Sequence, residues 1–408
     1  MSIGKDIIVF SSFRWDQPMA EASIALVKEL SKSCRVFFVN RPFSIKDLFI
    51  DHADLTMRSR IKTILLRRSP FMNVETGFSN FIVATPGLTI PINFLHKGFF
   101  YNALNVINNW VVKACMNRMV KEFEIREFVY LNLFNPIILP NLSLRSAKNV
   151  LNIYTVLHDI KFSPYMQRHG VQAQEKALKN ADLVLVNSKN QWRELISKVE
   201  NIYYFPNGVE YTVWESIRLK DIAAPYDLYN IGSTKVIMFC GYLSSNRVDY
   251  NLLRLVCENY PNYLVVLVGA YEEEDLIKYK LEEIPNLIIL GNRRYEAIPA
   301  YIKCAHVCII PYLCNDLNKS VYPLKLNEYL AMGKPVVSTL FSEDLEPFAN
   351  NVYLSSNYED FLSNIDLAIQ ENNAQRLENR IKLAEKNNWP YRVNLLNQLI
   401  AQFTRNER

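Results

Sequence analysis

The chain has 408 residues, half of them hydrophobic and 21% charged, which is an ordinary composition for a folded protein. Its first residues lack a basic-then-apolar pattern, and no apolar run reaches the length of a membrane span, which argues against a signal peptide and a membrane-spanning helix. This length predicts two domains, and we expect the protein in the cytoplasm, either free or peripheral on the inner face of the plasma membrane.

The net charge of +5 is unevenly distributed along the chain. Residues 1–207 carry 26 Lys and Arg against 16 Asp and Glu, whereas residues 208–408 carry 20 against 25. The basic half indicates contact with an anionic surface or acceptor. No nucleic-acid-binding module is recognisable, so no nucleic-acid partner is expected. The seven cysteines are odd in number and lie mostly in apolar segments, which favours reduced thiols. Cys304, Cys308 and Cys314 lack a paired Cys-x2-Cys spacing, so no metal site is predicted.

The N-terminal segment predicts a strand–helix–strand unit. Asp6–Ser11 and Cys34–Val39 are apolar strands on either side of a helix, and an open parallel sheet binds ligands beyond the carboxyl ends of its strands. The loop after the first strand is therefore a candidate site loop, with Arg14, Trp15 and Asp16 as candidate contacts; the alternative is that these are ordinary surface residues. The loop lacks Gly-x-Gly-x-x-Gly, so a dinucleotide cofactor is not expected, and we predict no cofactor at all.

Residues 41–72 interleave basic and apolar side chains. The pattern of an amphipathic, cationic helix is clearest at Arg60, Ile61, Lys62, Ile64, Leu65, Arg67 and Arg68. The stretch from Pro91 to Met119 could supply a second apolar face, with Phe94, Phe99, Phe100, Tyr101, Trp110 and Val111. These segments favour docking on an anionic membrane surface; the alternative is that the helices pack on the sheet.

Further strands are predicted at Glu127–Asn132 and Val150–Thr155. The second strand runs into His158 and Asp159, which could exchange a proton with a ligand hydroxyl or bind a ligand; a structural histidine is the alternative. We expect His169 at the surface of a helix. Phe205–Glu210 forms a Pro-Asn-Gly turn at the predicted domain boundary, and residues 211–233 are predicted to be an irregular linker.

The second half predicts alternating strands and helices whose turns meet at one sheet edge. The predicted strands are Lys235–Cys240, Tyr263–Val268, Asn286–Leu290, His306–Pro311, Pro335–Leu340 and Val352–Leu354. Gly241, Tyr242 and Arg247 follow the first strand, and the segment Gly241–Arg247 is predicted to end this strand and start a helix. Gly269 follows the second strand, Asn292 and Arg293 the third, and Tyr312 the fourth.

Ser320–Thr339 contains the most informative motif. A helix is predicted from Leu324 to Met332, with Pro323 at its entry and Gly333 at its end. Its N-terminus offers unpaired N–H groups and the positive end of the helix dipole, which suit a phosphate. Lys325 lies in the first turn and Glu328 one turn later on the same face, as expected for a cation that binds a diphosphate and a carboxylate that binds ribose hydroxyls.

Pro323-Leu-Lys-Leu-Asn-Glu-Tyr-Leu-Ala-Met-Gly-Lys-Pro-Val-Val-Ser-Thr339 resembles the donor-binding segment of GT-B glycosyltransferases of the glycosyl transferases group 1 (family 4) type, in particular those of bacterial capsule and exopolysaccharide synthesis. In that family the Lys contacts donor phosphate and the Glu binds the ribose. The Glu usually ends a Glu-x7-Glu motif, whose first position is Ser320 here; this departure indicates a different sugar preference. The turn at Phe205–Glu210 and the segment from Trp389 resemble the family's domain junction and its last helix.

The resemblance implies an α/β protein with two Rossmann-like, doubly wound domains that face a cleft. The expected parts are an acceptor-side domain at 1–207, a donor-binding domain at 208–388 and a C-terminal helix at 389–408 that packs back on the first domain. The loop with Arg14, Trp15 and Asp16 would lie on the acceptor side. The expected catalytic residues are His158, Asp159, Arg247 and Lys325. The expected donor-binding residues are Gly241, Tyr242, Arg247, Gly269, Asn292, Arg293, Tyr312, Ser320, Tyr322, Lys325, Leu326 and Glu328.

The predicted function is transfer of a sugar from a nucleoside diphosphate sugar, with UDP or GDP as the nucleotide, to a hydroxyl of a lipid-linked or growing surface glycan. Paired cations make a metal unnecessary, since they can stabilise the leaving diphosphate, and the resemblance implies retention of configuration. Two alternatives remain open. One is a catalytically silent scaffold or adaptor of the same fold, which Ser320 favours; the other is a nucleotide-sugar epimerase, which needs more acid and base groups than this chain offers.

Overall fold

The computed structural model describes residues 5–15, 21–50, 69–74, 80–162, 164–229 and 231–405. The chain forms two compact units. Unit 1 comprises Met1–Asn187, Gln191–Phe205 and Arg392–Arg408, and unit 2 comprises Ser188–Asn190 and Pro206–Tyr391. The division after Phe205 lies two residues before the predicted boundary, and the last segment of the chain groups with unit 1.

Unit 1 contains an eight-stranded sheet in the order β3-β4-β2-β1-β5-β6-β7-β8, counted over the described residues. All neighbouring strands are parallel except β3 and β4. The parallel strands β1, β2, β4 and β7 are almost entirely buried, because helices cover a parallel sheet on both faces. The strands are β1 Asp6–Ser11, β2 Val36–Val39, β3 Phe71–Asn73, β4 Phe81–Ala84, β5 Glu127–Leu133, β6 Lys148–Val156, β7 Leu183–Val186 and β8 Ile202–Tyr204.

The longest helix of unit 1 is α4, Phe99–Glu122. Its buried side chains, among them Val112, Met116 and Met119, pack on one face of the sheet with Ile8 and Phe37. Among the described residues, the other helices of unit 1 are α1 Glu21–Ser31, α2 Asp47–Ile50, α5 Pro164–Asn180, most of α6 Lys189–Leu195 and most of α15 Trp389–Arg405. The cationic helix predicted around Arg60–Arg68 lies outside the described residues.

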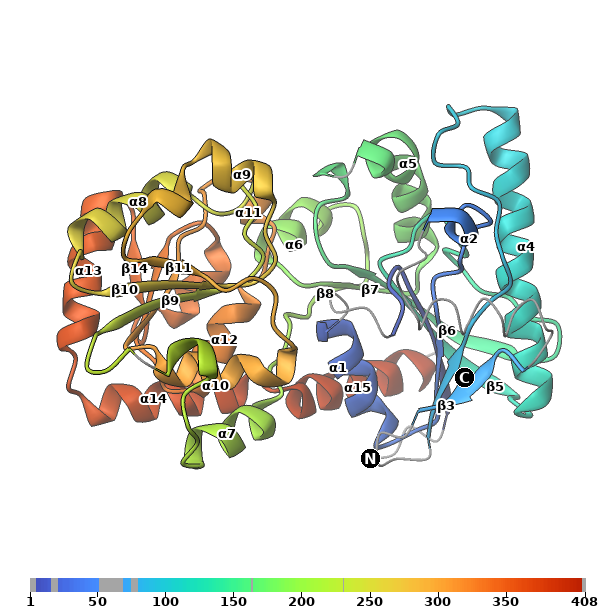
Figure 1. Cartoon of the computed structure of the whole chain (residues 1–408). Coiled ribbons are helices and arrows are strands. Elements are labelled where there is room, and N and C mark those ends of the chain that lie inside the picture. The colour runs from blue at the N-terminus through green and yellow to red at the C-terminus, as the bar shows by residue number, and fades with distance from the viewer. Residues whose placement is uncertain are drawn as a thin grey trace. The chain divides into compact units, whose positions relative to one another are not determined.

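Unit 2 is a second parallel α/β layer structure (Figure 1). Each predicted strand is confirmed to within two residues, in the order β11-β10-β9-β12-β13-β14. The strands are β9 Val236–Cys240, β10 Leu264–Val268, β11 Leu287–Ile289, β12 Val307–Ile310, β13 Val336–Thr339 and β14 Tyr353–Ser355. The helices are α7 Tyr211–Leu219, α8 Tyr250–Asn259, α9 Glu273–Lys278, α10 Ile298–Cys304, α11 Asp316–Lys319, α12 Leu324–Ala331, α13 Tyr358–Gln370 and α14 Ala374–Lys386.

The prediction of an irregular linker at residues 211–233 is wrong. This stretch forms α7 and the 3-10 turn Tyr226–Leu228, and both pack on unit 2. Trp214 has 0% exposure, and its indole Nε1 donates to the Tyr295 hydroxyl at 3.2 Å. Asp227 forms an ion pair with Arg293. The nine-residue helix is too short for its apolar spacing to stand out in sequence, and such a short helix depends on tertiary packing for its stability.

The expectation that His169 lies at the surface is also wrong. His169 is buried on α5, and its ring stacks on Tyr101 of α4 with the centroids 3.9 Å apart. Burial lowers the pKa of His169. The neighbouring residues Gln167, Arg168 and Gln172 are polar, so the sequence of α5 gives no sign that this position faces α4.

Candidate functional site

The order of strands in unit 2 reverses between β9 and β12, and open α/β sheets bind ligands at such a point, beyond the carboxyl ends of the strands. The ladder between β9 and β12 is short, since it pairs Ile237 with Val307 and Met238 with Cys308. The two strands then separate, and α12 begins in the segment that follows β12. This topology therefore brings the Gly241 turn and the motif helix to the same edge.

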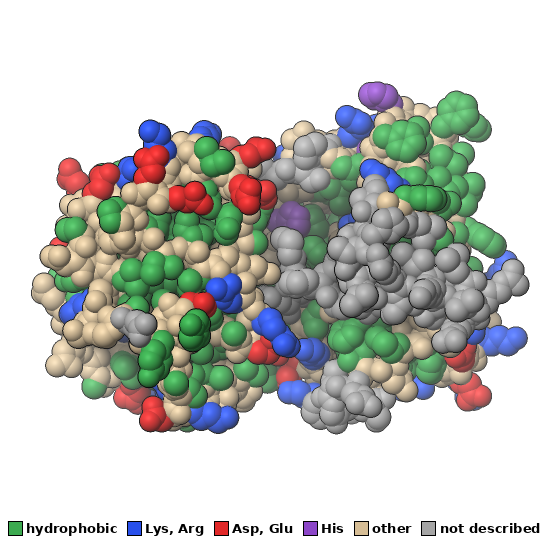
Figure 2. Space-filling model, viewed as in Figure 1, with side chains coloured by type: hydrophobic (Ala, Val, Ile, Leu, Met, Phe, Trp, Pro, Cys, Tyr) green, Lys and Arg blue, Asp and Glu red, His purple; other side chains and the backbone are tan. Residues whose placement is uncertain are grey.

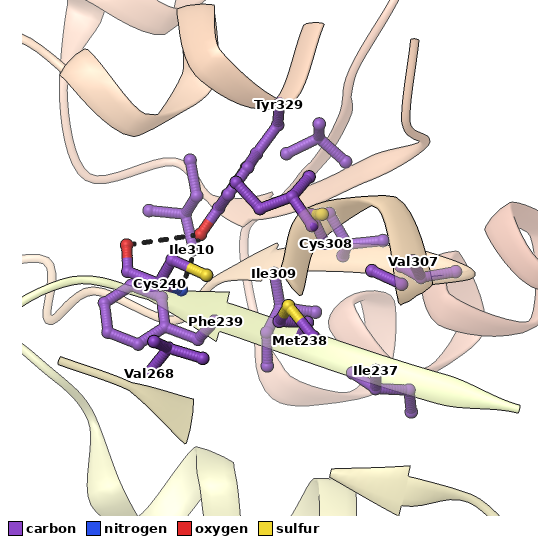
Figure 3. Close-up of a cluster of buried hydrophobic side chains, with 14 of the residues drawn as sticks. Ile237, Met238, Phe239, Cys240, Val268, Val307, Cys308, Ile309, Ile310 and Tyr329 are labelled. Carbon is purple, nitrogen blue, oxygen red and sulfur yellow. Dashed lines mark hydrogen bonds between the residues drawn. The ribbon is translucent and has the colours of Figure 1, made fainter. Parts of the chain in front are cut away.

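Tyr329 of the motif fixes α12 to the end of β9 (Figure 3). Its hydroxyl accepts the Cys240 backbone N–H at 2.8 Å and lies 3.4 Å from the Cys240 carbonyl oxygen. Cys240 lies beyond the residues that pair with β12, so the hydroxyl replaces a missing strand partner. The ring of Tyr329 is fully buried among the core side chains of unit 2. Tyr329 therefore positions the first turn of α12 relative to the turn after β9.

Three glycines end the adjacent strands β9, β10 and β11. The Gly241 N–H donates to Val268, and the Gly269 N–H donates to Gly291. Gly269 has φ +149°, and a Cβ at this position would overlap the carbonyl oxygen of Gly241. The two turns approach so closely that only glycine fits at Gly269.

We expect Gly269→Ala to destabilise unit 2 by about 2–4 kcal/mol, because backbone atoms rather than a flexible side chain must move. Gly232→Ala is the matched control for a glycine with positive φ, since φ is +57° there and no atom lies within 4 Å of the added Cβ. Chemical denaturation of both variants measures the difference. Equal losses would show that backbone conformation alone, without the close approach to Gly241, sets the cost.

Lys325 and Glu328 form an ion pair on α12 with 3.1 Å between Nζ and Oε2. The Glu328 side chain is only 1% exposed, whereas that of Lys325 is 22% exposed. Burial raises the pKa of Glu328, and Lys325 and a hydrogen bond from Tyr295 counter that rise. The carboxylate is therefore held in the protein interior by a cation on one side and a phenol on the other.

Arg247 lies near the same group. Burial raises the pKa of Tyr312, while the charges of Arg247 and Lys325 oppose this rise. The charges of both cations therefore act on Tyr312, which follows β12. The helix predicted to start in the segment Gly241–Arg247 begins slightly later, at Tyr250, with Asp249 as the N-cap of α8. Arg247 lies in the preceding turn, where its carbonyl accepts from Leu313 and Asn318.

The expectation of unpaired N–H groups at the start of α12 is also wrong in part. The N–H of Leu324 donates to Tyr322, and the N–H of Leu326 donates to Pro323. The Leu326 side chain is fully buried. The Tyr322 hydroxyl accepts from Asn327 at 3.0 Å, in the interior. These contacts come from the tight turn at Pro323, which precedes the helix without a capping side chain.

Ser320 is also buried, and its hydroxyl accepts from Asn190 at 2.9 Å. Asn190 belongs to the short piece 188–190 that groups with unit 2. In the same piece, the Lys189 N–H donates to the Asp344 carboxylate at 3.1 Å. The sequence gives no sign of this contact, since the residues concerned are 130 and 155 positions apart.

Other predicted donor-binding residues lie at the rim of this sheet edge. Tyr242 is exposed and bonds to Glu272, and Asn292 is exposed. The guanidinium of Arg293 is engaged by Asp227 and by the Tyr301 hydroxyl. The sequence analysis did not identify Trp214 and Tyr295, which link α7 to Glu328. No local signal marks Trp214, because its partner lies 81 residues away.

The predicted acceptor-side residues belong to unit 1. The Arg14 guanidinium lies 4.1 Å from the centre of the Phe43 ring. The backbone N–H of Trp15 donates to the Asn40 side-chain oxygen. Asp16 lies outside the described residues. The His158 ring contacts Phe134, with the centroids 4.2 Å apart. Asp159 accepts the N–H of Lys161 at 2.9 Å. His158 and Asp159 are half-buried and follow β6, as predicted.

A metal-binding cluster and a membrane-spanning helix are both absent from the ranges that the structure describes. No group of three or more His, Cys, Asp or Glu side chains is arranged to hold a metal ion. No helix in those ranges combines the length and apolar character that crossing a bilayer requires. The seven cysteines are free thiols.

Known proteins resemble this chain in part of its sequence and in its fold. Residues 234–369 match the family Glycosyl transferases group 1. TuaH of Bacillus subtilis (strain 168), which is named as a teichuronic acid biosynthesis glycosyltransferase, is 24% identical over 242 residues. That match spans 57% of this chain and 59% of TuaH, less than two thirds of the relative.

Solved structures match over the whole chain. The α,α-trehalose 6-phosphate synthase of Burkholderia multivorans has a TM-score of 0.69 at 11% identity, over 99% of this chain and all of that one. Anabaena Alr3699/HepE in complex with UDP and glucose has a TM-score of 0.62 at 16% identity, over 97% and 98% of the two chains. The chain therefore has the GT-B fold, as predicted, and its residues 234–369 are similar to the Glycosyl transferases group 1 family.

Proposed function

We propose that the protein is a glycosyltransferase that moves a sugar from a nucleoside diphosphate sugar to an acceptor hydroxyl. The observation that carries the proposal is the Lys325–Glu328 pair at the switch point of unit 2. A buried carboxylate lowers the stability of the folded protein unless cations and hydrogen-bond donors offset the loss of its hydration. Such a group with a raised pKa is typical of a functional site. The family match over the same domain supports this reading.

In the proposed reaction the bond between the anomeric carbon and the diphosphate oxygen breaks, and negative charge develops on the leaving diphosphate. The acceptor oxygen forms the new bond to the anomeric carbon, and its proton passes to the leaving diphosphate. Lys325 and Arg247, whose charges both act on Tyr312, stabilise this charge, and the guanidinium can bind two phosphate oxygens at once. Glu328 accepts hydrogen bonds from the ribose hydroxyls. No metal is required in this scheme, and retention of configuration is the expected outcome.

The acceptor would bind through unit 1. His158 and Asp159 would orient the acceptor hydroxyl or the transferred sugar, and Arg14, Trp15 and Asp16 would contact the acceptor. We propose a lipid-linked or growing surface glycan as the acceptor, which the name of TuaH supports. A UDP-hexose is the preferred donor in this proposal, supported by the UDP and glucose in the Alr3699/HepE complex. We further propose that the protein works in the cytoplasm, at the inner face of the plasma membrane.

A thermal-shift series with UDP, GDP, dTDP and CMP, each alone and with its sugars, tests the proposal. One nucleotide should raise the unfolding temperature of the wild type. The same nucleotide should leave the unfolding temperature of Glu328→Gln unchanged. Glu378→Gln is the matched control, because Glu378 lies exposed on α14 in the same unit. No shift with any nucleotide would favour a silent scaffold, and binding without transfer to any acceptor would favour it as well.

A further inference from the structure

Unit 1 contains a cavity of about 500 Å³ at the carboxyl edge of its sheet. The strand order reverses there between β1 and β5, as it does between β9 and β12 in unit 2. Ser12 follows β1, Arg41 follows β2 and Asn135 follows β5, and all three line the cavity. Its position is therefore that of a ligand site in a doubly wound sheet.

The lining of the cavity has a cationic part and an apolar part. Arg41 and Lys46 are exposed, and neither has an ion-pair partner among the described side chains. The acidic member of the lining, Asp47, accepts the Ser44 N–H at 2.7 Å. The apolar part includes Ile90, Ile92, Phe94, Ile137 and Met166. Such a lining fits an amphiphile with an anionic group.

A polar atom in the same lining lacks a partner. The side-chain oxygen of Asn105 on α4 is buried and accepts no hydrogen bond from the described residues. Its amide group donates weakly to Ile137, at 3.4 Å. A buried acceptor without a donor costs stability unless a ligand or water supplies one. A ligand hydroxyl in the cavity would satisfy it.

The cavity opens next to an unusually apolar surface. Phe94, Phe99 and Phe100 are 70%, 80% and 75% exposed. Figure 2 shows hydrophobic side chains gathered over the upper end and outer side of α4. We define this aromatic surface by its exposed residues Phe94, Phe99, Phe100, Val106, Ile107 and Trp110. Contiguous exposed apolar surface of this kind marks an interaction site.

The spacing on α4 separates this surface from the core. On α4, Phe99, Val106 and Trp110 lie on the opposite face from the buried residues. The buried face, with Val112, Met116 and Met119, packs on the sheet. The side chains of the aromatic surface on α4 are therefore not part of the core of unit 1. Phe94 belongs both to the aromatic surface and to the cavity lining, so the two are continuous.

We propose that unit 1 binds a phosphate-bearing lipid from a membrane surface. The aromatic surface enters the lipid interface, and the cavity receives the phosphate of the lipid against Arg41 and Lys46. Aromatic side chains next to cations are the combination that favours an anionic bilayer over a soluble ligand. The binding itself does not depend on the proposed function; the identification of this lipid as the glycosyl acceptor does.

Vesicle co-sedimentation with the full chain tests the proposal. Vesicles are made of phosphatidylcholine alone, of phosphatidylcholine with phosphatidylglycerol, and of phosphatidylcholine with a polyprenyl phosphate. The wild type should bind the two anionic compositions and bind the polyprenyl phosphate vesicles most tightly. Phe94→Ser/Phe99→Ser/Phe100→Ser should weaken binding to both by more than roughly tenfold, because binding scales with buried apolar area.

Arg41→Gln/Lys46→Gln should weaken binding to polyprenyl phosphate vesicles by roughly tenfold and remove the preference for this lipid. Two controls match these changes. Leu219→Ser/Ile277→Ser removes exposed apolar side chains from unit 2, and Lys121→Gln/Lys148→Gln removes two exposed cations from unit 1; both should bind like the wild type.

Three outcomes would overturn the proposal. One is wild-type vesicle binding in either test variant. Another is self-association of the wild type that the triple Phe variant abolishes, without vesicle binding, because a second copy would then cover the surface. The third has two parts: inorganic pyrophosphate abolishes vesicle binding, and the triple Phe variant binds vesicles as well as the wild type does. This result would indicate a soluble phosphate ligand. The nucleotide thermal shift should persist in every variant, so failure here is distinguishable from failure of the proposed function.

Discussion

Lys325→Ala is expected to weaken binding of the nucleoside diphosphate by roughly 100-fold, because it removes a charge-assisted contact and leaves the buried Glu328 carboxylate facing an anionic ligand. Isothermal titration with the nucleotide that gives a thermal shift measures the loss. The double variant Lys325→Ala/Glu328→Gln separates the two contributions, since it removes the cation without leaving the buried charge. If Lys325→Ala binds like the wild type, Lys325 does not contact the diphosphate.

The same variant should show a distinctive dependence of stability on pH. Burial is the largest influence on the pKa of Glu328 and raises it, and Lys325 opposes that rise. Without Lys325 the folded-state pKa rises further above the unfolded value. Because the folded state then binds the proton more tightly than the unfolded state, the variant loses stability as pH increases from the unfolded pKa through the folded pKa.

The deficit of Lys325→Ala relative to the wild type should therefore be larger at neutral pH than near the ordinary pKa of a glutamate. Chemical denaturation across this range measures it. In Lys325→Ala/Glu328→Gln the additional pH dependence should disappear. A deficit that is the same at all pH values would show that Lys325 does not stabilise the Glu328 carboxylate.

Trp214→Ala is expected to destabilise unit 2 by about 3–5 kcal/mol, the usual cost of removing a large buried aromatic side chain. Trp214 is fully buried, and its indole holds the Tyr295 hydroxyl, which in turn bonds to Glu328. The variant should also bind nucleotide more weakly than its stability explains, because Tyr295 is no longer fixed. Thermal unfolding and nucleotide titration on the same sample measure the two effects.

Two further variants make the Trp214 result specific. Trp214→Phe retains most of the buried ring and lacks the N–H donor, so it should keep most of the stability and lose part of the nucleotide affinity. Leu219→Ala changes an exposed residue on the same helix and should alter neither quantity. Normal nucleotide affinity in folded Trp214→Phe would show that the contact with Tyr295 is purely structural.

The sequence determined the parts of this protein whose signal is local. The strands of unit 2 are short apolar runs that end in glycine or polar turns, and each was predicted to within two residues. The motif from Pro323 to Thr339 was sufficient to predict α12 and β13, because Pro at the entry, Gly333 at the exit and the i, i+3 spacing of Lys325 and Glu328 all act within a few residues. The same motif resembles the family that residues 234–369 match, and the fold that this resemblance implied is confirmed.

Only the tertiary structure decided which side chains are buried and which segments meet. Tyr101 was predicted as part of an apolar face with Phe99 and Phe100, but it is buried against His169 of α5. Helix α4 carries apolar residues on more than one side, so its sequence does not indicate which side packs on the sheet.

The burial of Glu328 could not be predicted from the sequence either. A glutamate one turn after a lysine is usually a solvated pair, and its 1% exposure arises from packing with segments distant in the chain. Trp214 and Tyr295, which are 81 residues apart in the chain, meet beside it, and Tyr329 fixes its helix to Cys240 across 89 residues. Local propensity acts over a few residues, whereas burial depends on contacts that form only when the sheet has brought its strand ends together.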